Sequence, residues 1–261
     1  MLARTLLVRG MLVGLAAGLV AFLVARLSGE AAVGEAIAFE GAQGHLHEAA
    51  TVPLATEEPE LVSRTVQSTI GLLTATTLYG VALGGLFALA VAFAAGTFGR
   101  LRARATCAAM ALVGFVAVNL VPFLKYPPNP PAVGNHETID QRTALYAAMV
   151  AMSVLLTVLA VRLGRKLAPR LGSWNAVLAA VAGYGVAVGV VMLALPDINE
   201  VAPDFPATTL WSFRTSSLAT GFSVWATLGL LLGALTERDL NRAGNSDDRA
   251  AGARGLGANP G

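Results

Sequence analysis

The chain has 261 residues, of which 55% are hydrophobic and 13% charged, whereas roughly a quarter are charged in a soluble domain. This composition excludes an ordinary soluble domain, and the 28 glycines suit closely packed membrane helices. The net charge of +2 says little by itself, because it hides an uneven distribution of acids and bases. Long charge-free stretches without period-2 alternation exclude a β-barrel and predict an all-α integral membrane protein.

The charge-free stretches are as long as a bilayer is thick, since a helix crosses it with about 20 apolar residues. They predict a bundle of about six transmembrane helices in a single domain covering residues 1–236. The second stretch is too short for two spans and a turn, so it counts once. The predicted spans cover residues 5–27, 66–99, 105–124, 143–161, 171–196 and 215–236, with an outer loop over residues 28–65.

Basic residues concentrate on one side of the predicted bundle. Of the 18 lysines and arginines, 13 flank the ends of the spans on the side that holds both termini, and 12 of the 16 acids lie on the other side. The positive-inside rule therefore predicts that both termini are cytoplasmic. Residues 237–261 mix Asn, Asp, Arg, Gly and Ala, and predict a disordered cytoplasmic tail.

Small residues recur at four-residue spacing in several spans, which lets a second helix approach closely. The first span carries such a stripe at Gly10, Gly14 and Gly18. Pairs with the same spacing predict a tight bundle and occur at Gly80/Gly84, Gly185/Gly189 and Gly229/Gly233.

The first span has an alternative interpretation as a cleaved signal peptide, because it has a basic start and a short apolar core. Its extent to Leu27 and the absence of a clear A-x-A site favour a retained span. The single cysteine, Cys107, lies within the third span, so no intrachain disulfide is expected.

The outer loop over residues 28–65 is rich in acids and contains His45-Leu46-His47-Glu48. In an extended segment, alternate side chains share a face, so His45 and His47 could meet one divalent ion. Imidazole suits nickel, cobalt, copper or zinc, and a carboxylate from Glu40 or Glu48 could complete the shell. The third histidine, His136, is predicted on the same side. A solvated acidic loop with incidental histidines is the alternative.

A second predicted outer loop is dense in proline and follows the third span. Proline fixes φ and removes a donor, so this stretch cannot continue a helix and predicts a stiff, shaped surface. The alternative is a loop that only turns the chain. The residues of this predicted mouth are Lys125, Tyr126, Asn129, Pro130, Pro131 and Gly134.

Three predicted outer loops end in the same pair of residues, an arginine followed by a threonine. Arg64, Arg142 and Arg214 each precede an even-numbered span, at spacings of 78 and 72 residues. This pattern suggests three repeated helical hairpins, with a ring of arginines at the outer mouth.

No ionisable residue lies centrally in any predicted span, which counts against a self-sufficient ion pump and favours a subunit that works with a partner. The sequence has no nucleotide-binding loop, Ser/His/Asp set, HExxH or CxxC motif. We therefore expect no enzyme, no permanently bound cofactor and no nucleic-acid partner, but a chain embedded in the lipid bilayer.

The run PFLKYP at residues 122–127, followed by NPPAVG at 129–134, resembles the predicted cobalt transporter subunit family CbtA. Further similar stretches extend the resemblance over nearly the whole chain and lie at residues 78–88, 137–139, 142–143, 195–196, 205–207 and 211–214. The resemblance implies a bacterial inner-membrane protein of five or six spans. It also implies a small single-span partner, CbtB, with a histidine-rich end, and a role in cobalt uptake linked to cobalamin synthesis.

The resulting prediction is a membrane subunit of a divalent metal uptake system whose transported ion is cobalt by resemblance, with nickel and zinc left open. A non-transporting membrane scaffold that recruits a partner through stiff outer loops is the alternative. An intramembrane enzyme is a third possibility, disfavoured by the lack of a paired acid, base or nucleophile.

Overall fold

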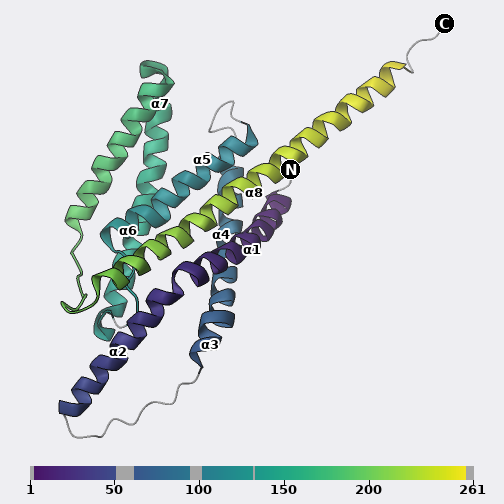
Figure 1. Ribbon diagram of the computed structural model, residues 1–261. Coiled ribbons are helices and arrows are strands. Elements are labelled where there is room, and N and C mark those ends of the chain that lie inside the picture. Colours follow the sequence, from purple (N-terminus) through teal and green to yellow (C-terminus); the bar gives the residue numbers. More distant parts are fainter. Residues whose placement is uncertain (1–2, 51–61, 95–101, 132, 257–261) are drawn as a thin grey trace. The chain divides into compact units, whose positions relative to one another are not determined.

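The computed structural model describes residues 3–50, 62–94, 102–131 and 133–256 (Figure 1). Within these ranges the backbone is helical apart from short connections, and no strand occurs. The predicted all-α class is therefore confirmed.

Several of the helices are built from consecutive elements. The chain begins with α1 (Ala3–Ser28) and α2 (Glu30–Ala50). The next long helix combines α3 (Arg64–Val66), the π-helical turn η1 (Gln67–Gly71) and α4 (Leu72–Ala94). The following one combines α5 (Ala103–Phe115), the π-helical turn η2 (Val116–Leu120) and α6 (Val121–Lys125). The short 3-10 turn η3 (His136–Thr138) then leads into α7 (Ile139–Ala194), and α8 (Ala207–Leu256) ends the described chain.

Five helices in the described part of the chain are long and apolar enough to cross a membrane. One of them, α7, is a hairpin, because Gly172 adopts φ 77° and ψ 159° and reverses the helix direction. Its two arms lie side by side in Figure 1. Ser153 of the first arm and Tyr184 of the second share a hydrogen bond of 2.8 Å between their hydroxyls. Counting these arms separately gives six apolar segments, as the sequence predicts.

The described helices fall into two compact units. The first unit comprises residues 1–20, 75–112 and 224–261. In it, α1 and α4 run antiparallel with their backbones in contact. A Cβ added to Gly84 would lie 2.7 Å from Cα of Gly14, and one added to Gly80 would lie 2.9 Å from Cα of Gly18. The predicted glycine contact between two helices is thus confirmed.

The α5 and α8 segments of the first unit also meet through small residues. A Cβ on Gly233 would lie 3.0 Å from Cα of Arg104, and one on Gly229 would lie 3.3 Å from the carbonyl oxygen of Cys107. At the same contact, Arg104 forms a 3.0 Å ion pair with Glu237. By contrast, a Cβ on Gly185 or Gly189 would have nothing within 4 Å, so this predicted pair makes no close helix contact in the described chain.

Two segments predicted as irregular are helical. The predicted outer loop is helical from Glu30 to Ala50, and α8 extends through the predicted tail to Leu256. Alanine, glutamate, leucine and arginine favour helix, so both segments continue the helical conformation despite their polarity. The extended conformation assumed for residues 45–48 is therefore wrong.

The second unit comprises residues 21–74 and 113–223. It contains α2, both arms of α7, the proline-rich loop (residues 125–134) and the loop at residues 195–206. One apolar cluster joins α2, the proline-rich loop and the loop at residues 195–206, with Ala36, Val133 and Phe205 at its centre. Phe39 packs edge-on against Phe205 with ring centroids 5.1 Å apart. This unit holds the candidate site.

Candidate functional site

The proline-rich loop is fixed at its first residues by the loop at 195–206. The ammonium group of Lys125, whose side chain is only 9% exposed, pairs with the Asp197 carboxylate. Tyr126 donates a 2.8 Å hydrogen bond from its hydroxyl to the carbonyl oxygen of Pro196. The two predicted outer loops thus form one structure.

Further along, the proline-rich loop is held by an arginine of α8. Arg214 donates from Nη2 to Oδ1 of Asn129 at 2.9 Å and from Nε to the carbonyl oxygen of Pro128 at 3.4 Å. Pro130 of the same loop is buried. Contacts from α8 and from the loop at 195–206 therefore hold the proline-rich loop in place.

A carboxylate from the 195–206 loop organises the end of the proline-rich loop. Glu200 accepts hydrogen bonds from the Thr138 hydroxyl and, at 2.9 Å, from the backbone N–H of Asn135. It also lies 3.4 Å from Nε of Arg142. The Thr138 hydrogen bond, the Asn135 N–H and then the Arg142 charge lower the pKa of this carboxyl below its usual value of 4.5.

Gly134 permits the close approach of Arg142 to the same loop. Its φ of 128° lies in a region that residues with side chains rarely adopt. A Cβ at this position would also lie 2.9 Å from Cζ of Arg142. Glycine is thus required here both by the backbone and by the guanidinium beside it.

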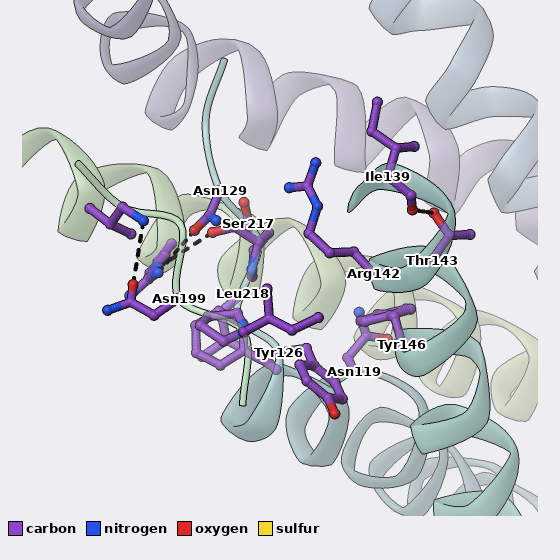
Figure 2. Close-up of a pocket in the computed structure, with 16 residues that line it drawn as sticks. Asn119, Tyr126, Asn129, Ile139, Arg142, Thr143, Tyr146, Asn199, Ser217 and Leu218 are labelled. Carbon is purple, nitrogen blue, oxygen red and sulfur yellow. Dashed lines mark hydrogen bonds between the residues drawn. The ribbon is translucent and has the colours of Figure 1, made fainter. Parts of the chain in front are cut away.

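These loops and helices enclose a pocket of about 590 Å³. Figure 2 shows Asn129, Asn199 and Ser217 on one side of the pocket and Thr143 and Tyr146 on the other. The remaining lining comes from the proline-rich loop, the 195–206 loop, η2, α6, α7 and α8: Asn119, Phe123, Tyr126, Pro127, Pro128, Ile139, Arg142, Ile198, Val201, Arg214 and Leu218. Its volume falls within the usual range for small-molecule sites, roughly 300–1,000 Å³.

The charges at this pocket are of one sign. Arg142 and Arg214 both line it, and none of its described lining residues is an acid. Hydrogen-bonding groups accompany them on Asn119, Asn199 and Ser217. A bare divalent cation prefers oxygen anions or imidazoles, so this lining does not suit one.

Asn119 reaches the pocket from the π-helical turn η2, a local geometry that often occurs at functional sites. Its amide occupies the space where a side chain on Gly221 of α8 would lie. Gly221 therefore makes room for a polar group on this wall.

The predicted metal ligands stay a prediction. Glu40 is exposed on α2, whereas the side chains of His45, His47, Glu48 and His136 lie outside the described part of the chain. Among the described residues, no group of three His, Cys, Asp or Glu side chains is placed to hold a metal.

Two of the three predicted mouth arginines line the pocket, and the ring of three stays a prediction. Arg64 forms a 2.7 Å ion pair with Glu30 and does not line the pocket, which takes only Arg142 and Arg214. Among the described acids, Glu35 accepts a 2.6 Å hydrogen bond from Thr209, and Asp204 accepts one from Gln43. Several acidic side chains of these segments therefore connect helices and loops to one another.

Sequence reasoning missed several pocket residues. Asn119 was detectable as a polar residue inside an apolar span, but Asn199, Tyr146 and Ser217 carry no sequence signal that separates them from ordinary loop and helix residues. They become candidates only because distant segments meet around one cavity.

Apolar helices long enough to cross a bilayer, together with an arginine-lined pocket bounded by their connecting loops, define a multi-pass helical membrane protein. The model of the family described as "Probable cobalt transporter subunit (CbtA)" matches residues 3–237, and the chain belongs to this family. Comparison with curated proteins gave no match, and neither did comparison with solved structures. The family description names a transporter subunit, which implies partner proteins and points away from an enzyme.

Proposed function

We propose that the chain is the membrane subunit of a divalent metal uptake system that carries cobalt as its substrate. The observation that carries this proposal is the family match over residues 3–237. The apolar helices supply a structure that can cross a bilayer. The bias of lysine and arginine towards one side supports an inner-membrane location with both termini in the cytoplasm.

In this proposal, Glu40, His45, His47 and Glu48 of α2, together with His136, collect the ion before it enters the bundle. Imidazole and carboxylate groups are suitable ligands for cobalt. Because α2 is helical, positions 45 and 48 share a helix face whereas positions 45 and 47 do not. His45 and Glu48 are accordingly the pair in this segment best spaced to act together.

The proposed partner is a small single-span protein of the CbtB type with a histidine-rich end. The word "subunit" in the family description supports a partner of some kind. A histidine-rich partner would supply imidazoles beyond the three histidines of this chain. A link to cobalamin synthesis would give the imported cobalt its use.

A non-transporting scaffold is the second candidate. The observation that favours it is the rigid attachment of the proline-rich loop through Lys125, Tyr126 and Asn129, which gives a fixed surface for a partner. It predicts no metal uptake.

The test is uptake of radioactive cobalt into cells that lack their own cobalt importers. The chain is expressed with and without the partner, and His45→Ala/His47→Ala is compared with the exposed control Gln67→Ala on η1. We expect uptake that requires the chain and falls in the double variant alone. Uptake unchanged in the double variant would discard the histidine site, and no uptake by membrane-inserted protein in any combination would favour the scaffold.

A further inference from the structure

We propose that the pocket beside the proline-rich loop binds a small organic carboxylate of net charge about −1. For a metal permease the fitting ligand is a divalent cation complexed by a tricarboxylate, and this second step rests on the proposed function. Two arginines, Arg142 and Arg214, line this pocket.

The two guanidinium groups are not equally neutralised. Arg142 lies 3.4 Å from the Glu200 carboxylate, which compensates its charge. Arg214 contacts only neutral acceptors, Asn129 and the carbonyl of Pro128, and no carboxylate within the described ranges lies at ion-pair distance from it. The pocket therefore carries about one uncompensated positive charge.

Arg214 is half-buried at this pocket, and a guanidinium that no carboxylate neutralises is a candidate for binding an anionic ligand. Guanidinium presents a planar fork of donors that matches a carboxylate with two parallel hydrogen bonds. In Arg214 this is the Nη1–Nη2 edge, because Nε and one N–H of Nη2 already hold the proline-rich loop. The side-chain amides of Asn119 and Asn199 line the same pocket and carry N–H groups suited to further ligand oxygens. The Ser217 hydroxyl also lines the pocket and donates its proton to the carbonyl oxygen of Phe213.

The size and walls of the pocket favour an organic anion. A volume of about 590 Å³ far exceeds the space that one inorganic ion needs. Phe123, Tyr126, Tyr146 and Leu218 give it apolar surface against which a carbon skeleton can pack. A small ligand with carboxylates on a carbon frame satisfies both kinds of lining.

The net charge of the ligand distinguishes the possible members of this class of organic carboxylates. A free tricarboxylate brings about three negative charges, whereas its 1:1 complex with a divalent cation brings one, which balances Arg214. The complex also accounts for a pocket without acids, because the carboxylates that hold the metal come with the ligand and not from the protein.

The test is a binding measurement on the purified full-length chain in lipid nanodiscs, with four probes: cobalt(II)–citrate, free citrate, inorganic phosphate and cobalt(II) chloride. We expect cobalt(II)–citrate to bind most tightly. Arg214→Lys keeps the charge but loses the planar fork and should weaken binding about tenfold or more. Ser217→Phe places a ring in the pocket while leaving both arginines in the sequence, and it should abolish binding.

Matched controls lie outside the pocket. Ser212→Phe adds the same ring to an exposed position of α8, and Arg26→Lys makes the same exchange at an exposed arginine. Both should bind as the unaltered protein does. A folded Ser217→Phe variant that still binds the complex would overturn the proposal, as would tighter binding of phosphate or no binding of any carboxylate.

Free citrate binding more tightly than its cobalt complex would keep a carboxylate site and overturn the metal complex as its ligand. Cobalt uptake that requires the chain but is unchanged in Arg214→Lys and Ser217→Phe would overturn the role of the pocket and leave the transporter intact. Carboxylate binding without cobalt uptake would support the pocket as a carboxylate site and overturn the transporter. The failure of one proposal can therefore be told apart from the failure of the other.

Discussion

Arg214 in α8 holds Asn129 of the proline-rich loop through a 2.9 Å hydrogen bond between Nη2 and Oδ1. The residues are 85 positions apart in the sequence, and the bond joins a long helix to a segment with no regular structure of its own. It fixes one wall of the pocket.

We expect Asn129→Ala to destabilise the protein, because a hydrogen bond to a charged donor contributes about 1.5–3 kcal/mol. Thermal unfolding in nanodiscs measures the loss, and a double-mutant cycle with Arg214→Gln isolates the pair. Asn175→Ala, which removes a 3.2 Å bond to the carbonyl oxygen of a neutral residue four positions earlier, should change stability less. Equal losses at positions 129 and 175, or no coupling between 129 and 214, would contradict a specific contact.

Glu200 predicts a pH dependence of the loop structure. Its pKa is lowered by Thr138, the Asn135 N–H and Arg142, so its ionised form stabilises the fold. This contribution is complete above the usual carboxyl pKa of about 4.5 and is lost as pH falls below that value through the folded-state pKa. The stability advantage of the unaltered protein over Glu200→Gln should therefore shrink as pH falls from 5 to about 3. Glu137→Gln, at an exposed neighbour, serves as the control, and an advantage that grows on acidification would refute the assignment.

The α1–α4 contact predicts a sharp difference between glycines. Gly80→Ala places a Cβ 2.8 Å from the backbone nitrogen of Gly18, so the helices must separate at a cost of about 1–3 kcal/mol. Gly189→Ala meets nothing within 4 Å and should be neutral or slightly stabilising, since alanine favours helix. Unfolding temperatures of the two variants check this, and indistinguishable values would contradict the close contact.

Substitutions at Gly134 and Gly172 distinguish the effect of backbone strain from that of a steric contact. Both adopt positive φ, but a Cβ on Gly134 meets the Arg142 guanidinium, whereas one on Gly172 meets nothing within 4 Å. Alanine at either position should cost about 1–3 kcal/mol through strain. Only Gly134→Ala should also weaken carboxylate binding in the pocket, as measured by the titration proposed for cobalt(II)–citrate. Loss of binding in both variants would indicate a general folding defect.

The broad architecture could be predicted from the sequence because apolar length and glycine spacing depend on local patterns. The stripe at Gly10, Gly14 and Gly18 identified a close helix contact, although only the structure assigns α4 as its partner. The conformation of the acidic segment at Glu30–Ala50 was not predicted correctly. Its polarity indicated a loop, but its many alanines and glutamates favour helix and the segment forms α2.

The pocket was only partly predictable. Its proline-rich wall and its two arginines stood out in the sequence, since proline and isolated cations are conspicuous among apolar spans. The partners of those arginines did not, because Glu200 for Arg142 and Asn129 for Arg214 are set by how distant loops pack. The uncompensated charge of Arg214 therefore depends on which residues pair in the folded chain, and the amino-acid composition does not specify those pairs.

The π-helical turn η2 makes the pocket sensitive to chain length. A π-turn holds one residue more than the regular helix around it, so losing a residue within Val116–Leu120 would leave a smooth and locally better bonded helix. Every position from there to the proline-rich loop would then rotate by about 100° relative to Phe115. Asn119 would leave its place opposite Gly221. Deletion of a single codon here would therefore remove Asn119 from the pocket wall without replacing any pocket residue. Insertion of one codon would restore it.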